Sequence, residues 1–198
     1  MRPVLVDLYC GMGGAAKGYS DAGFDVIGFD IEPQPHYPYR FVQVDVLELS
    51  WDTLRRYDAI HASPPCQVHS VATPRTVRTG LVDLIPRTRE LLDASGRPWV
   101  MENVVGAPMH RPIQLCGSSF GLGVRRHRLF ETWSDEIVGK PCCHHEQGPT
   151  ISVAGHFSES LAEAQAAMGI DWGDKRSLTQ AIPPAFTRWI GDQLIRAV

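Results

Sequence analysis

The residue best suited to covalent chemistry is Cys66, in the stretch Ser63-Pro64-Pro65-Cys66-Gln67. The preceding segment, Tyr57–Ala62, has the pattern of a short buried strand. Each proline fixes its own φ and restricts the residue before it, so the chain leaves this strand on a stiff loop. A cysteine on such a loop is suited to act as a nucleophile. A lone cysteine more often fills a small apolar gap, so this assignment depends on the rest of the chain.

A second reactive group, Glu102, follows the predicted strand Pro98–Met101. In open α/β sheets ligands bind at the carboxyl ends of the strands, so Glu102 and Cys66 are expected to face one pocket. A carboxyl group beside an apolar strand end tends to have a raised pKa and to be available as a proton donor. Arginines cluster farther along, at Arg125, Arg126 and Arg128, and indicate a local phosphate-binding face.

A glycine-rich turn near the amino terminus predicts a nucleotide site. The pattern predicts a buried parallel strand over Val4–Tyr9, then the turn Cys10-Gly11-Met12-Gly13-Gly14, then a helix over Ala15–Ala22. Glycines let the backbone approach a ligand, and the helix amino terminus supplies free N–H groups. The turn lacks the full dinucleotide spacing, so it is not specific alone.

Two acidic residues follow the next predicted strands. Asp30 comes after Phe24–Phe29 and is placed to accept hydrogen bonds from ribose hydroxyls, unless it is a solvated loop carboxylate. Asp45 follows the predicted strand Arg40–Val44 and is placed either to meet an adenine amino group or to cap the following turn.

The remaining segments supply the frame. Residues 67–80 are polar and predict a mobile loop that closes over substrate. Apolar spacing predicts a helix over 81–94, split or bent at Pro86. Ile113–Cys116 predicts a strand, and 125–132 alternates as an edge or half-exposed strand does. Two further helices are expected at about 159–168 and 184–197.

Composition narrows the class of protein. The 198 residues are 43% hydrophobic and 21% charged, which is ordinary for a soluble globular domain. The formal charge of −3 is not that of a protein that holds long nucleic acid by charge alone. Five irregularly spaced cysteines do not suggest a disulfide framework, and no membrane-spanning run or signal pattern is present. We therefore expect an intracellular protein, without a membrane partner.

Five segments in this order resemble the cytosine-5 DNA methyltransferase family: Asp7–Gly14, Asp30–Glu32, Ser63–Gln67, Glu102–Val104 and Arg126–Arg128. The resemblance covers about residues 3–132 and, more weakly, 159–198. It implies an α/β fold of the Rossmann-like, S-adenosylmethionine-dependent methyltransferase type, with a mostly parallel sheet and helices on both faces. It also implies a DNA substrate containing cytosine, and a cytoplasmic location, in the host cell if the protein is phage-encoded.

The resemblance assigns roles to individual residues. Cys66 would attack C6 of cytosine, Glu102 would donate a hydrogen bond to N3, and Arg126 and Arg128 would position the base and brace the catalytic loop. A base in a duplex would first be flipped out, with the 67–80 loop stabilising that state. The residues implied to bind S-adenosylmethionine are Asp7, Tyr9, Cys10, Gly11, Met12, Gly13, Gly14, Asp30, Ile31, Asp45, Val46 and Pro64.

The chain departs from the family in the region that reads DNA sequence. Between a catalytic core (1–132) and the final helices (159–198), only residues 133–158 stand where the family has a sizeable target recognition domain. That insert is too short for an independent core. The protein therefore either reads a short site, as compact phage-type relatives do, or borrows specificity from a dimer mate or partner, or acts on a free nucleotide such as dCMP. Besides these enzymes, the protein could be a DNA-binding relative without catalytic activity. The presence of Cys66 and Glu102 disfavours this class.

Two further segments carry weaker expectations. Gln180–Pro184 stands where the family has a Gly-Asn-Ser turn beside the cofactor, which raises the possibility of a modified S-adenosylmethionine as donor. Cys142-Cys143-His144-His145 suggests zinc, with Cys116 or His156 completing the site. Adjacent ligands do not fit the usual spacing, so a solvent-facing loop without metal is the preferred interpretation.

Overall fold

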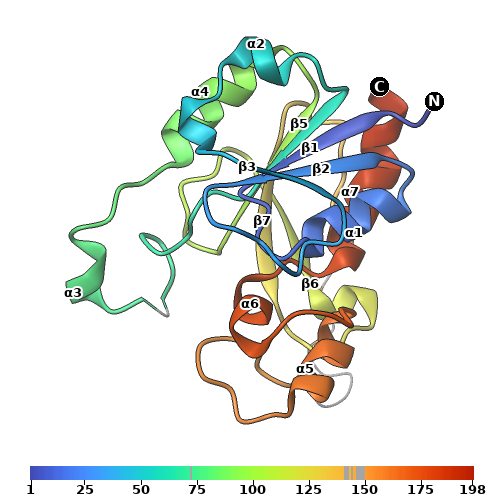
Figure 1. Cartoon of the computed structure of the whole chain (residues 1–198). Coiled ribbons are helices and arrows are strands. Elements are labelled where there is room, and N and C mark those ends of the chain that lie inside the picture. The colour runs from blue at the N-terminus through green and yellow to red at the C-terminus, as the bar shows by residue number, and fades with distance from the viewer. Residues whose placement is uncertain (72, 141–142, 144, 146–149) are drawn as a thin grey trace.

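The computed structural model describes residues 1–71, 73–140, 143, 145 and 150–198. Its centre is a seven-stranded sheet of order β3-β2-β1-β4-β5-β7-β6 (Figure 1). Strands β1 to β5 pair in parallel, whereas β7 is antiparallel to both of its neighbours. The strands are β1 (Val4–Leu8), β2 (Asp25–Asp30), β3 (Arg40–Gln43), β4 (Ala59–Ala62), β5 (Trp99–Asn103), β6 (Ile113–Cys116) and β7 (His127–Thr132). The predicted mostly parallel α/β fold is confirmed.

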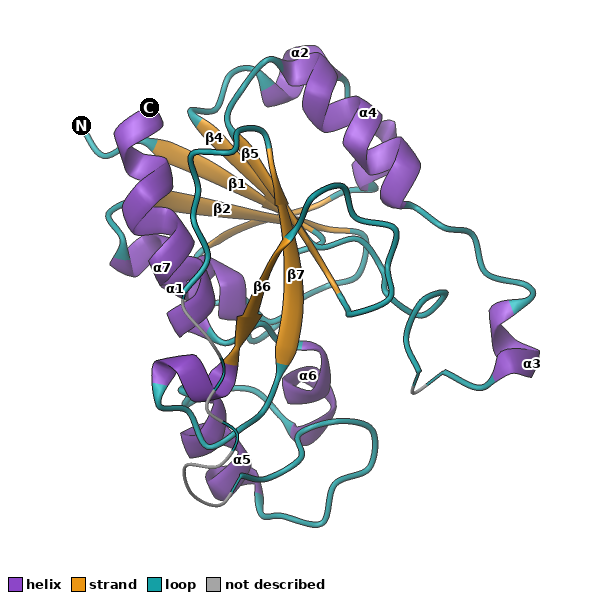
Figure 2. Cartoon of the chain, turned by 180° about the vertical axis from the view of Figure 1, so that it is seen from behind, coloured by secondary structure: helices purple, strands orange, loops and turns teal. Residues whose placement is uncertain are grey.

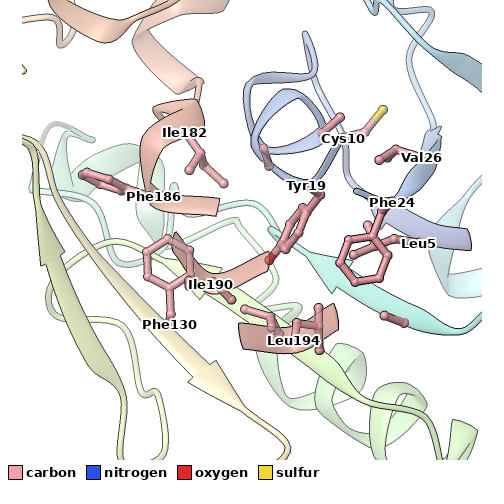
Figure 3. Close-up of a cluster of buried hydrophobic side chains, with 14 of the residues drawn as sticks. Leu5, Cys10, Tyr19, Phe24, Val26, Phe130, Ile182, Phe186, Ile190 and Leu194 are labelled. Atoms are coloured by element: carbon pink, nitrogen blue, oxygen red, sulfur yellow. The ribbon is translucent and has the colours of Figure 1, made fainter. Parts of the chain in front are cut away.

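Helices cover both faces of the sheet (Figure 2). Helices α1 (Gly14–Asp21) and α7 (Pro184–Leu194) pack together on one face, and α2 (Trp51–Leu54) and α4 (Ile85–Ser95) lie on the other. Successive strand side chains point to opposite faces, so Leu5 joins the core under α1 and α7 whereas Val6 joins the core under α4. Figure 3 shows the first of these cores, in which aromatic and aliphatic groups from both helices meet the sheet.

A smaller unit, here called the small lobe (residues 151–182), extends beyond the sheet and contains α5 (Leu161–Met168) and α6 (Lys175–Gln180) (Figure 1). It has a buried cluster of its own, and this cluster includes Met12 of the glycine turn. The indole Nε1 of Trp172 donates a 2.8 Å hydrogen bond to the Met12 carbonyl oxygen. The small lobe is therefore fastened directly to the predicted nucleotide site.

Three predictions about elements need correction. The 125–132 strand, expected to be an edge or half-exposed, is half-exposed but not an edge, because β7 lies between β5 and β6. Pro86 does not split its helix, since α4 begins at Ile85 and Pro86 stands in the first turn, where a missing N–H costs nothing. Helix α6 was not predicted; its capping box, Asp174 with Ser177, was the local signal.

The remaining elements are short: α3 (Arg75–Arg78) and the 3-10 helices η1 (Val46–Glu48), η2 (Gly117–Phe120) and η3 (Ile195–Ala197). Across the part of the chain that the structure describes, no helix combines the length and apolar character needed to cross a bilayer.

Candidate active site

The loops after β1 and β4 meet where the strand order reverses. Strand β1 pairs with β2 on one side and β4 on the other, and such a switch point opens a crevice at the carboxyl ends. Ser63, which begins the cysteine loop, donates from its backbone N–H to Leu8 (3.1 Å) and from its hydroxyl to the Tyr9 carbonyl (3.3 Å). The predicted nucleophile loop and glycine turn are therefore held side by side.

The glycines of the turn have two kinds of surroundings: Gly11 faces open space, whereas Gly13 and Gly14 pack closely against protein atoms. Gly11 (φ 49°) has nothing within 4 Å of the position that a Cβ would occupy. At Gly13 (φ 89°) a Cβ would approach Pro38 to 2.8 Å, and at Gly14 it would lie 2.4 Å from the Ile182 carbonyl oxygen. Gly13 and Gly14 thus permit protein packing, whereas Gly11 leaves a cradle that a ligand can enter.

The groups beside this cradle match those that a nucleoside needs. Asp30 accepts hydrogen bonds from the backbone N–H groups of Gly11 and Glu32, both at 3.0 Å, and each carboxylate oxygen keeps a further lone pair. Ile31 is an exposed apolar side chain (55% of its surface), as expected of a residue that packs on a planar ring. Asp45 accepts from the Leu47 N–H at 2.9 Å and caps η1, which was the second of its two expected roles. The described residues fit an S-adenosylmethionine adenosine.

Other predicted cofactor residues lie beneath the turn. Asp7 is fully buried, and its carboxyl group faces the Tyr37 hydroxyl. Burial, and secondarily the Asp30 charge, raises the pKa of Asp7 well above its ordinary value. The side chains of Cys10, Met12 and Val46 are also buried in core clusters. These side chains support the turn from within the protein.

The cysteine loop is braced from β5. Asn103 Nδ2 donates a 2.9 Å hydrogen bond to the carbonyl oxygen of the buried Pro64. The Cys66 carbonyl accepts from the N–H groups of His69 (3.0 Å) and Ser70 (2.8 Å), so the chain turns immediately after the cysteine. Sequence reasoning gave Asn103 no role; its position beside Glu102 at a strand end was the only signal.

Glu102 and Arg128 form an ion pair in the sheet, with Glu102 Oε1 2.8 Å from Arg128 Nε. Their side chains are only 8% and 15% exposed. The register explains the contact: Glu102 of β5 lies opposite Phe130 of β7, so Arg128 is its diagonal neighbour on the same face. That Glu102 oxygen has no hydrogen bond among the described residues.

Charges from this pair act on the cysteine. Burial and the Glu102 carboxylate raise the pKa of Cys66, while Arg128 and Arg126 lower it. Burial also raises the pKa of Glu102, against the opposing effect of Arg128 and Arg126. The four predicted catalytic residues are therefore close enough to influence one another, and burial is the largest cause that raises the pKa of Cys66 and of Glu102.

Arg126 has a different position from Arg128. Its guanidinium donates to the Val153 carbonyl at 2.7 Å and also to the Thr179 carbonyl, while its Nε has no partner among the described residues. Burial lowers the pKa of Arg126 well below its ordinary value. Arg126 thus joins the start of β7 to the small lobe, a role that no local pattern in the sequence indicates.

The predicted substrate loop lies on the outside of the molecule. It includes α3, which has no buried residue. Within and just after this loop, the described side chains of Val71, Val77 and Val82 are exposed by 92%, 53% and 74%. Figure 1 shows α3 extending away from the sheet. This part of the chain therefore presents apolar and basic groups without burying them.

Comparisons with known proteins agree with this architecture. No family model matches the sequence. The chain is 29% identical over 122 residues to the type II methyltransferase M.XorII of Xanthomonas oryzae, a match that covers 53% of the chain and 29% of that protein. It is 35% identical over 96 residues to the type II methyltransferase M.AplI of Arthrospira platensis, covering 42% and 28%. The chain thus spans less than a third of the length of the curated relatives it matches.

Solved structures show the same fold at low sequence identity. The methyltransferase EhMeth of Entamoeba histolytica matches all of this chain and 99% of its own, with a TM-score of 0.64 at 10% identity. A prophage-encoded E. coli protein, named as a DNA modification methyltransferase, matches 82% of this chain and 54% of its own (TM-score 0.54, 20% identity). The fold is therefore that of S-adenosylmethionine-dependent methyltransferases, and the local similarity to type II methyltransferases agrees with the resemblance to DNA methyltransferases stated from the sequence.

Proposed function

We propose that this chain transfers a methyl group from S-adenosylmethionine to C5 of cytosine in DNA, through a covalent bond between Cys66 and C6. The observation that carries the proposal is the 2.9 Å hydrogen bond from Asn103 of β5 to the Pro64 carbonyl, which fastens the Cys66 loop to the strand that carries Glu102, the partner of Arg128. The similarity to type II methyltransferases supports a DNA substrate.

Each catalytic residue has a chemical task in this proposal. The Cys66 thiolate adds to C6, and its electron pair displaces ring electrons toward N3 and C5. Glu102, paired with Arg128 in the structure, would take up a proton as cytosine binds, which its raised pKa favours, and would then donate a hydrogen bond to N3 and stabilise the negative charge that develops there. C5 gains the methyl group and loses its proton to a base, and the electrons of the broken C–H bond expel Cys66 from C6. Arg128 holds the Glu102 carboxyl in place and favours the thiolate of Cys66.

The cofactor would occupy the cradle at Gly11, with its ribose on Asp30 and its adenine against Ile31. Tyr9, Gly13, Gly14 and Pro64 would line or shape that cradle, while Asp7, Cys10, Met12 and Val46 would support it from the protein interior. S-adenosylmethionine supplies an electrophilic methyl group on a sulfonium centre. Gln180–Pro184 abuts the turn through the Ile182 carbonyl, so a modified donor remains the alternative for this pocket.

DNA would approach over the exposed loop around α3, where Arg75 is exposed and the half-buried Arg78, whose Nε donates to the Thr73 carbonyl, keeps further N–H donors for a phosphate. The proposed division of the chain is a catalytic core (1–132), a short insert (133–158) and a closing segment (159–198). The small lobe stands beside the site where a recognition unit is expected. A dimer mate or a specificity partner is part of the proposal, because the insert alone offers little surface.

The test is an assay of labelled methyl transfer to duplex DNA, single-stranded DNA and dCMP, followed by mass spectrometry of the modified base. We expect 5-methylcytosine in DNA; transfer to dCMP alone would identify the free-nucleotide enzyme, and a group other than methyl would identify a modified donor. DNA containing 5-fluorocytosine should trap a covalent adduct, because fluorine at C5 cannot leave as a proton does. A Cys66→Ser protein that still forms the adduct would overturn the assignment of the nucleophile.

A further inference from the structure

Four potential metal ligands converge at the β6–β7 side of the sheet: Cys116, His127, Cys143 and His145. One ligand atom from each lies within 4.8 Å of all the others. The Cys116 Sγ is 3.3 Å from His145 Nε2, and the His127 and His145 rings meet edge to face with centroids 5.0 Å apart. The proposed reaction uses none of these groups.

Two of the four come from a strand pair. Cys116 of β6 and His127 of β7 are directly opposite in the antiparallel register, so their side chains project from the same face. His127 and Arg128 are consecutive in β7 and therefore point to opposite faces. The cluster thus lies across the strand from the Glu102–Arg128 ion pair.

The other two, Cys143 and His145, belong to the insert between β7 and the small lobe. Cys143 is exposed and His145 is half-buried. The Arg125 guanidinium donates a 2.9 Å hydrogen bond to the His145 carbonyl oxygen. The 133–158 segment is too short to form a hydrophobic core, and a bound metal is one of the means by which such a segment is fixed.

We propose that Cys116, His127, Cys143 and His145 bind a structural zinc ion. Two thiolates and two imidazoles are a usual tetrahedral zinc set, and with four protein ligands the site is closed to substrate. Zn–S and Zn–N bonds of about 2.3 and 2.0–2.1 Å separate tetrahedral ligand atoms by about 3.3–3.8 Å, so small side-chain movements would close this cluster on the ion. The Ser118 hydroxyl, 3.2 Å from Cys116 Sγ, would donate to the bound thiolate. The zinc would tie the insert to β6 and β7.

This arrangement changes the earlier expectation of a metal-free loop. The sequence suggested Cys142-Cys143-His144-His145 with Cys116 or His156; the structure brings in Cys116, and it adds His127. Cys142 and His144 lie outside the described residues, and His156 is exposed and not part of the cluster.

The experiment measures zinc in the full chain, purified without a histidine tag and under reducing conditions, then dialysed against zinc-free buffer. We expect about one zinc ion per chain by mass spectrometry of the metal, and a spectrum of tetrahedral thiolate coordination after replacement by cobalt(II). Cys143→Ser should lose the metal and melt at a lower temperature. Because Cys143 is exposed, this change does not disturb the core.

Two matched variants separate ligand loss from general damage. His156→Ala and Cys142→Ser should retain a full complement of zinc. Ser118→Ala should keep the four ligands and lower zinc affinity by about tenfold or more in competition with a chelator. Reduced protein that holds no zinc after reconstitution would overturn the proposal. Loss of zinc from Cys142→Ser but not from Cys143→Ser would do so too. Neither outcome depends on the methyl-transfer assay.

Discussion

Arg128 Nε lies 2.8 Å from Glu102 Oε1, and the charges of both residues act on the Cys66 thiol with opposite sign. A carboxyl group and a cation on two paired strands thus both act on a nucleophile in the loop after β4. The reactivity of the Cys66 thiol therefore depends on Glu102 and Arg128, and this dependence can be measured in the protein without substrate.

Glu102→Gln should make Cys66 more reactive at neutral pH. The neutral amide removes the negative charge that raises the pKa of Cys66, and leaves the arginines that lower it. The pH profile of Cys66 alkylation by iodoacetamide, followed by peptide mass spectrometry, should therefore move to lower pH. Arg128→Gln is the matched opposite and should move the profile to higher pH. If the alkylation profile is unchanged in both variants, the ion pair does not influence the pKa of Cys66.

Asp7→Asn should stabilise the protein, and more so as the pH rises. The pKa of Asp7 is raised in the folded state, so the unfolded chain releases this proton first as the pH rises past its ordinary value. The wild-type protein then loses stability until the pH passes the folded pKa, whereas the amide titrates in neither state. Urea unfolding should show a gain of about 1–3 kcal/mol above that range and a smaller difference at acidic pH. A pH-independent difference would indicate an unshifted carboxyl group.

Gly11→Ala and Gly14→Ala should have different consequences. Alanine at Gly11 meets no protein atom but enters the proposed cradle, so the protein should fold, with about 1–2 kcal/mol of backbone strain, and bind cofactor at least about tenfold more weakly. Alanine at Gly14 collides with the Ile182 carbonyl, so that variant should lose stability. Calorimetry with S-adenosylhomocysteine and thermal melting distinguish the two. Full affinity in Gly11→Ala would place the cofactor elsewhere.

Arg126→Met should loosen the small lobe from the sheet. The change leaves the carbonyl oxygens of Val153 and Thr179 without their shared donor, and each costs about 1–3 kcal/mol if it stays buried. Limited proteolysis should cut within 151–182 faster than in the wild type, while cleavage in β1 to β5 is unchanged. Equal protection of both regions would contradict the bridging role of Arg126.

The strand, glycine turn and helix at the amino terminus could be predicted from the amino-acid sequence, as could the positions of Cys66 and Glu102 at strand ends. These features depend on hydrophobic runs and on glycine and proline, whose conformational effects act within a few residues. The sheet-edge rule then placed the two reactive groups together, and the fold agrees.

The pairing of the strands and the contacts between distant residues could not be predicted in this way and are known from the folded structure. The insertion of β7 between β5 and β6 makes Arg128 the diagonal neighbour of Glu102 and sets Cys116 opposite His127. Arg126 reaches carbonyl groups 27 and 53 positions away. Such contacts depend on register and on the packing of whole elements, and neither is encoded in the spacing of residues along the chain.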